Sequence, residues 1–132
     1  MQGAFGYELD LSRLNVEDKE EIRKQVKIYK ENFQVIQTGD YYRLTSPWEN
    51  RDVTVWSYVA EDRSRAILSA VYTDLHANPA PGRVHWKGLE ADAVYEVEGR
   101  EYTGAALMYG GYLLPVPGCN YDSCMLVAVK KN

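Results

Sequence analysis

The stretch FQVIQTGDYYRLTSPWE, residues 33–49, contains the change of pattern that decides the fold. Apolar residues at helical spacing end at Gly39, and Tyr41, Tyr42, Pro47 and Trp48 follow within ten residues. Two interpretations arise: an aromatic platform that grips a ligand, or a junction between two structural units. The residues on either side favour the junction.

Upstream of Gly39, residues 15–36 predict one long amphipathic helix. Asn15 is expected to cap its start, and acidic residues in the first turns with lysines in the later turns suit the helix dipole. We expect Gly39 to end the helix in a left-handed conformation. Apolar residues recur every three or four positions and predict a single stripe, formed by Ile22, Val26, Tyr29, Phe33 and Ile36.

The segment before the helix, AFGYELDL at residues 4–11, alternates and predicts a strand, with Phe5, Tyr7 and Leu9 on one face. One strand and one helix cannot complete a parallel sheet, because such a strand needs neighbours on both sides. Residues 1–38 therefore form a unit of their own. They either wrap around the rest of the chain or are the last unit of a structure whose remainder lies elsewhere.

Downstream of Gly39 the period changes from helical to two, and short strands are separated by Gly, Pro and Asp signals. One helical turn is expected within residues 103–111. The pattern predicts a mostly β fold, an antiparallel β-sandwich of Greek-key type over residues 39–132. The expected strands begin at residue 40 and continue at residues 53–60, 66–75, 83–87, 93–99, 112–116 and 124–131.

Composition narrows the class of protein. The 132 residues are 45% hydrophobic and 26% charged, with a net charge of −4, so a nucleic-acid partner is not expected. No apolar run approaches the ~20 residues of a membrane span, and MQGAFGYELD does not resemble a secretory signal. We expect a cytoplasmic protein that has no membrane partner.

The two cysteines, Cys119 and Cys124, allow one disulfide, but reduced structural thiols in a cytosolic protein are favoured. His76 and His85 have no Cys or His at ligand spacing beside them. No metal or other cofactor is therefore predicted. Both histidines are interpreted as surface residues.

Several stretches resemble the C-terminal region of glycoside hydrolase family 36 α-galactosidases, the melibiases. The resemblance implies that residues 4–36 are the last βα unit of a (β/α)8 barrel and that the sandwich is the domain after it. It also implies hydrolysis of terminal α-galactosides with retention, by two aspartates on earlier barrel strands. The matching stretches are GAFGYELDLSRL, IYKENFQVIQTGDYYRLTSPWE, GLEADAVYEVEG, YTGAALMYGGYLLP and YDS.

No catalytic, substrate-binding, cofactor-binding or metal-binding residue is assigned to this chain. HWKG, residues 85–88, lacks the aspartate of the nucleophile motif, and EDRSR, residues 61–65, lies in an expected hairpin turn. A retaining glycosidase holds two carboxyl groups about 5 Å apart. The adjacent acidic pairs are interpreted instead as solvated faces: Glu17/Asp18, Glu20/Glu21 and Glu61/Asp62.

The alternative is an autonomous carbohydrate-binding or protein-interaction module, which would stack sugars on outward-facing aromatics. We favour instead a core position for Trp56, Tyr58 and Trp86, because aromatic side chains dominate the cores of small β-domains. Trp48 follows Pro47 at the junction and is predicted to be exposed.

Two partners are predicted for residues 5–36. In a complete enzyme, the upstream catalytic barrel of the same polypeptide would cover this segment. In the isolated chain, its apolar residues would favour a homo-oligomer, because a large exposed apolar patch is rarely left bare.

Overall fold

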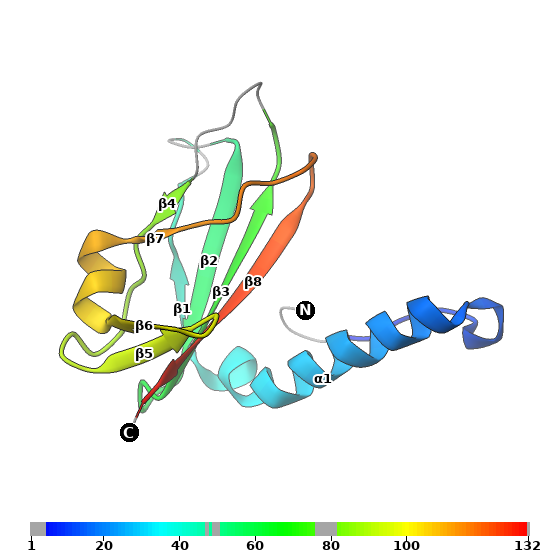
Figure 1. Ribbon diagram of the computed structural model, residues 1–132, viewed down its shortest axis with the longest axis horizontal. Coiled ribbons are helices and arrows are strands. Elements are labelled where there is room, and N and C mark those ends of the chain that lie inside the picture. The colour runs from blue at the N-terminus through cyan, green and yellow to red at the C-terminus, as the bar shows by residue number, and fades with distance from the viewer. Residues whose placement is uncertain (1–4, 47, 49–50, 76–81, 132) are drawn as a thin grey trace.

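The computed structural model describes residues 5–46, 48, 51–75 and 82–131, which form a β-sandwich with one long helix projecting from it (Figure 1). The helix, α1 (Val16–Thr38), follows a short 3-10 turn, η1 (Leu11–Arg13). Among the described residues, no helix is long and apolar enough to cross a membrane.

The start of α1 agrees with the prediction, but its end differs. Asn15 caps the helix, since its Oδ1 accepts a hydrogen bond from the Asp18 N–H at 2.7 Å. Gly39 follows the last helical residue, yet its φ of −73° and ψ of 157° are extended, so the predicted left-handed cap is wrong. Glycine is required at position 39 because there is no room for a side chain. A Cβ there would lie 2.5 Å from the Val35 carbonyl oxygen and 2.7 Å from that of Val59.

The main sheet has six antiparallel strands in the order β1-β2-β3-β8-β5-β6. The late strand β8 inserts between β3 and β5, so the sheet is not a simple meander; this agrees with the predicted Greek-key type of connection. The strands are β1 (Asp40–Arg43), β2 (Val53–Val59), β3 (Arg65–Tyr72), β5 (Val94–Val97), β6 (Arg100–Thr103) and β8 (Ser123–Lys130).

The second sheet pairs β4 (Arg83–Val84) with β7 (Tyr112–Leu113). Between β6 and β7, η2 (Ala106–Gly110) is a short π-helical turn inside the predicted range. Both β4 and β7 are shorter than expected, at two residues each.

The core lies between the two sheets. Alternate residues of β2 and β3 face inward, among them Val55 and Leu68, and they meet Trp86 and Leu107 from the other layer. Trp86 is only 1% exposed, which confirms its predicted core position. The opposite, outer face of the main sheet is the one on which α1 packs.

Two elements differ from the prediction. Residues 5–10 form no strand. A strand needs a hydrogen-bonded neighbour, and the main sheet as described does not extend to this segment. The hairpin strand β6 was not predicted, because Arg100 and Glu101 interrupt any alternation of apolar and polar residues.

Candidate functional surface

The last turns of α1 attach the helix to the outer face of the sheet. Val35 and Ile36 pack on the fully buried Ile67 of β3. Beside them Asn32 is only 2% exposed. Its Oδ1 accepts a hydrogen bond from Arg65 Nη1 at 2.8 Å, and its Nδ2 donates to the Ile28 carbonyl at 2.7 Å. A buried polar side chain whose donor and acceptor are both satisfied fixes the helix in one position on the sheet.

Only part of the predicted apolar stripe takes part in this contact, since Ile36 is buried in it and Tyr29 packs against it. Successive helical residues are rotated by about 100°, so the residues preceding Ile36 in the stripe lie about a quarter turn from Asn32. Phe33 is 49% exposed, so the sheet does not cover it. We use "stripe" from here on for these four residues: Ile22, Val26, Tyr29 and Phe33.

Residues 5–10 run back along α1 (Figure 1). The Phe5 ring lies 5.0 Å from that of Tyr29, and the Tyr7 hydroxyl donates to Gln25 Oε1. The segment predicted as a strand therefore lies against the helix that comes after it. This arrangement leaves Leu9 and Leu11 open to solvent, at 50% and 57% exposed.

On the opposite side of α1 from the stripe, a cleft of about 610 Å³ separates the end of the helix from the β2–β3 turn. Its walls combine charged and apolar groups. Glu31, Glu61 and Asp62 line it together with Arg65, which Asn32 already engages. We assign no chemistry to this cleft.

The outer face of the sheet carries a row of larger side chains next to the α1 contact. Trp56 of β2 pairs in register with Ser69 of β3, and Ser69 pairs with Met125 of β8. Trp56 and Met125 are half-buried. The core position predicted for Trp56 and Tyr58 is therefore wrong: both point away from the main core, because Val55 and Val59 occupy the inward positions of β2.

The other aromatic residues differ in how far they are exposed. Trp48 is 88% exposed, as predicted. Tyr58 packs against the small cluster under α1, and its ring lies 5.4 Å from that of Tyr41. Nothing in the sequence distinguished the two faces of β2, because both carry apolar residues.

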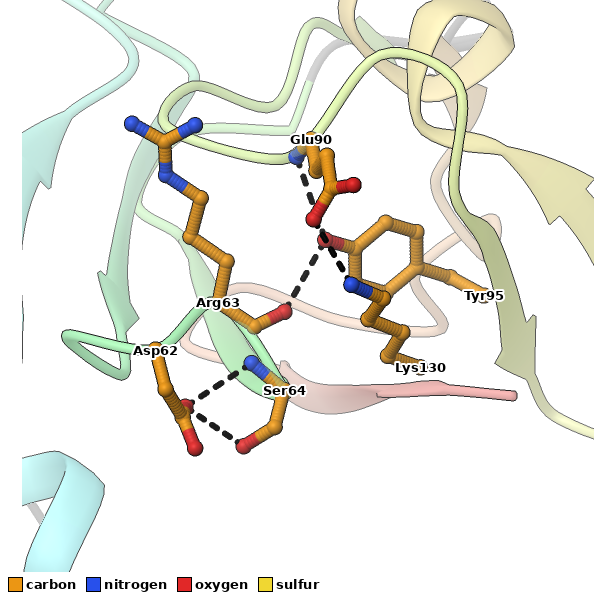
Figure 2. A network of polar contacts seen from close by, with 6 residues as sticks. All are labelled: Asp62, Arg63, Ser64, Glu90, Tyr95 and Lys130. Carbon is orange, nitrogen blue, oxygen red and sulfur yellow. Dashed lines mark hydrogen bonds and ion pairs between the residues drawn. The ribbon is translucent and has the colours of Figure 1, made fainter. Parts of the chain in front are cut away.

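A polar network joins three segments at one end of the sandwich (Figure 2). The Tyr95 hydroxyl donates to the Arg63 carbonyl at 2.9 Å and accepts from the Glu90 N–H at 3.1 Å. Lys130 Nζ lies 2.7 Å from Glu90 Oε2. The network holds the β2–β3 turn, the loop before β5 and the end of β8 together.

The electrostatics of this end of the sandwich do not suit glycoside hydrolysis. The hydrogen bond from Lys130 lowers the pKa of Glu90, and the hydrogen bonds from the hydroxyl and N–H of Ser64 lower the pKa of Asp62. Both carboxyl groups are thus held ionised, whereas a glycosidase needs one carboxyl with a raised pKa as general acid. The network is structural.

The remaining candidate residues lie apart from one another. His85 is exposed and its Nδ1 lies 3.0 Å from the Met108 carbonyl oxygen, whereas His76 falls outside the described residues. Cys119 and Cys124 are free thiols, and burial raises the pKa of Cys124. Over the described part of the chain, no group of metal-ligating side chains comes together.

The acidic pairs predicted to be solvated are exposed on α1 and on the β2–β3 turn: Glu17/Asp18, Glu20/Glu21 and Glu61/Asp62. On α1 a lysine approaches one of these carboxylates, since Lys24 Nζ lies 3.8 Å from Glu21 Oε2. These groups form a hydrated surface.

The fold is a β-sandwich with one long helix attached to the outer face of its main sheet. Comparisons with known proteins identify the family to which such a chain belongs. Residues 53–127 match the family described as the glycosyl hydrolase family 36 C-terminal domain. The chain belongs to that family, which confirms the resemblance noted in the sequence.

Two similar proteins of known function are much longer than this chain. The bifunctional alpha-galactosidase/sucrose kinase AgaSK of Mediterraneibacter gnavus is 43% identical over 117 residues, covering 87% of this chain and 12% of that protein. Alpha-galactosidase AgaA of Geobacillus stearothermophilus is 37% identical over 126 residues, covering 95% of this chain and 17% of that protein. The chain thus spans less than a fifth of their length.

Solved structures agree over nearly the whole chain. The crystal structure of AgaA superimposes with a TM-score of 0.89 at 35% identity, covering 96% of this chain and 18% of that one. The galactosidase domain of AgaSK gives a TM-score of 0.87 at 38% identity, again over 96% of this chain. Because the match extends beyond the sandwich, α1 belongs to the shared structure.

Proposed function

We propose that this chain is the non-catalytic C-terminal region of an α-galactosidase, and that the whole enzyme hydrolyses terminal α-galactosides. The observation that carries the proposal is the match of 96% of this chain to 18% of the AgaA structure. The two catalytic aspartates would belong to the part of the enzyme upstream of this region.

In this proposal the chain's partner is the catalytic part of the same polypeptide. Tyr7, Leu9 and Phe33 are suited to contact it, because these apolar side chains are exposed. The contact between α1 and β3 would then hold the sandwich in place next to this partner.

A chimera tests the proposal. AgaA without the region that this chain matches would be compared with AgaA in which this chain replaces that region, on a chromogenic α-galactoside. We expect the truncated enzyme to be inactive or insoluble and the chimera to recover activity. The isolated chain should show only background turnover.

Two results would contradict the proposal. One is a chimera no more active than the truncated enzyme. The other is turnover by the isolated chain that survives purification and is lost when one acidic residue is replaced.

We further propose that isolated copies pair through residues 5–36, since the same apolar surface then has no catalytic part to cover it. The cytoplasmic location expected from the N-terminal sequence also stays a prediction.

A further inference from the structure

The main sheet contains an open edge in its middle, at the first half of β8. On one side, β3 pairs with β8 in register over residues 123–129. On the other side, β5 pairs with it only over residues 128–130. The β5–β6 hairpin then turns at Glu98, whose φ is 48°, so no described strand lies beside the earlier residues of β8. We call residues 122–126 the open edge.

The direction of the main-chain groups alternates along β8. The Lys130 N–H donates to the Ser64 carbonyl beside β3, and the Lys131 N–H donates to the Val94 carbonyl of β5, each at 2.8 Å. Successive residues of an antiparallel strand bond to opposite sides. Even-numbered residues of β8 therefore bond to β3, and odd-numbered residues face away from it.

Met125 and Ser123 are thus the residues that direct main-chain groups out of the open edge. Over the part of the chain that the structure describes, the N–H and carbonyl of Met125 have no main-chain hydrogen-bond partner. The Ser123 carbonyl also points outward, whereas its N–H donates to Asp122 Oδ1 at 2.9 Å. The open edge therefore offers donors and acceptors to a further strand.

The open edge lacks the charges that protect the two ends of the sheet. The end strands are short and charged: β1 contains Asp40 and Arg43, and β6 contains Arg100 and Glu101. Charged residues, proline and bulges at an edge hinder the addition of another strand. SCMLVAV, residues 123–129, contains no charged residue, proline or glycine. Such a segment favours pairing with a further strand.

The open edge is complementary to itself. In a twofold antiparallel pair centred on Cys124, Ser123 of one copy would lie opposite Met125 of the other. The Met125 N–H of each copy would then donate to the Ser123 carbonyl of the second copy. The two edges also match in length, because each ends at Tyr121, where φ is 64° and the chain turns away.

The position of α1 favours a second copy over an extended peptide. Tyr29 and Met125 pack against the same small cluster, so α1 crosses β8 near Tyr29. The earlier turns of α1 project beyond β8 (Figure 1), and Ile22 and Val26 line a groove of about 370 Å³ on them. A second copy at the open edge would bring its sheet under these turns, whereas an extended peptide would leave them uncovered.

The two surfaces are needed together. A stable dimer buries about 800 Å² of each partner. A strand over residues 122–126 is only about 17 Å long, so strand pairing aligns the copies but does not supply this area. Exposed apolar side chains within residues 5–36 supply the rest, among them Leu9, Ile28 and Phe33.

We propose that two copies of this chain pair edge to edge through residues 122–126, with Cys124 opposite Cys124 of the second copy, so that their main sheets form one continuous sheet. This pairing rests on the self-association proposed for residues 5–36 and deepens it, because it names the strand that aligns the copies. It is independent of the α-galactosidase assignment.

Oxidation with diamide tests the register. Opposite residues of a non-hydrogen-bonded antiparallel pair have Cα atoms about 4.5 Å apart, which a disulfide can span. Diamide accepts the thiol hydrogens as the disulfide forms. On a non-reducing gel, we expect Cys119→Ala to form a disulfide-linked dimer several times faster than Cys124→Ala, although Cys119 is the more exposed thiol.

Two proline variants test the main-chain hydrogen bonds. Met125→Pro removes an N–H that points away from β3, so the pairing with β3 is kept. Val127→Pro is the matched control, because its N–H points the same way but lies outside the open edge. In sedimentation experiments, we expect Met125→Pro to raise the Kd of the dimer by about tenfold or more and Val127→Pro to keep the native value. Near-ultraviolet circular dichroism checks that both variants are folded.

A native chain that stays monomeric at high concentration would overturn the proposal, as would a diamide product that depends on Cys119 instead of Cys124. A native-like dimer in folded Met125→Pro would show that the copies pair through α1 alone. If Met125→Pro does not fold, the diamide comparison decides the matter. Activity of the AgaA chimera tests the proposed function separately from these results.

Discussion

Gly39 shows how one residue sets the position of a whole helix. The chain passes so close to the carbonyl oxygens of Val35 and Val59 that no side chain fits between them. Both oxygens belong to backbone held by hydrogen bonds, so neither can move aside easily. The identity of this residue is fixed by packing and not by a left-handed turn.

Gly39→Ala should therefore destabilise the chain by about 1–3 kcal/mol, the usual range for inserting a methyl group into a closely packed site. Urea unfolding followed by circular dichroism would measure the change. Gly110→Ala is the control, because no atom lies within 4 Å of the Cβ it would add. Equal effects of the two substitutions would show that the close approach at Gly39 does not govern stability.

Ionisation of the Tyr112 hydroxyl makes the free energy of unfolding depend on pH in the alkaline range. Desolvation and the hydrogen bond that its hydroxyl donates to Glu98 raise its pKa from 10.0 to about 12. A pKa raised by folding contributes stability that is complete below the unfolded value of 10.0 and is lost as the pH rises through about 12.

We expect the free energy of unfolding of the native chain to fall between pH 10.0 and about 12. Tyr112→Phe, which cannot ionise, should show a shallower fall in urea titrations over that range. Tyr109→Phe, at a site that is 76% exposed, should keep the native slope. A native slope in Tyr112→Phe would contradict the argument.

At the scale of elements, the join between α1 and β3 depends on a polar pair inside an apolar contact. Removing one partner of a buried hydrogen bond leaves the other unsatisfied, which costs about 1–3 kcal/mol. Asn32→Ala would leave Arg65 without its partner at 2.8 Å. The sandwich core is on the other face of the sheet and should not be affected.

Asn32→Ala should thus loosen the helix while the sandwich stays folded. Thermolysin should cleave within α1 several times faster than in the native chain, with near-ultraviolet circular dichroism of the core unchanged. Lys30→Ala, an exposed change two residues earlier in the helix, is the control. Unchanged cleavage in Asn32→Ala would mean that Val35 and Ile36 hold the helix without the polar pair.

The elements also show what the sequence could predict. The helix and the strands β2, β3, β5 and β8 were found because strong periodicity and turn residues define them locally. The strand predicted at residues 4–11 is absent from its described residues, 5–11, because alternation describes side-chain direction, whereas a strand also needs a neighbour that local sequence cannot provide. The wrong core position predicted for Trp56 has a similar cause. Alternation separated the two faces of β2 but could not show which face meets the second sheet.

The candidate surface was only partly predictable for a related reason. The stripe is visible in the spacing of Ile22, Val26, Tyr29 and Phe33, but no local pattern indicates that Asn32 is buried against the sheet while Phe33 is exposed. The row of side chains beside α1 on the outer face depends on strand register across β2, β3 and β8, which are far apart in sequence. Register of this kind is a property of the folded sheet.

At the scale of the whole molecule, the exposed apolar side chains within residues 5–36, such as Leu9 and Phe33, predict self-association of the isolated chain. The native chain should be a dimer at high concentration in light scattering, since pairing would bury apolar side chains at about 25 cal/mol per Å² before association costs. Val26→Asp combined with Phe33→Asp should give a monomer with a folded sandwich. A strictly monomeric native chain whose residues 5–36 resist proteolysis would contradict this picture.

The position of β8 has a consequence for synthesis. Until Ser123–Lys130 leaves the ribosome, the strands β1, β2 and β3 form a separate group from the hairpin of β5 and β6, because β8 is what connects them in the sheet. The helix can form early from local contacts, but the main sheet must wait for β8, which is made after the strands it joins, and pairings so distant in sequence form slowly. During translation, α1 and the edges of β3 and β5 would therefore be exposed together, which makes this interval the one in which the nascent chain is most open to chaperones and to aggregation.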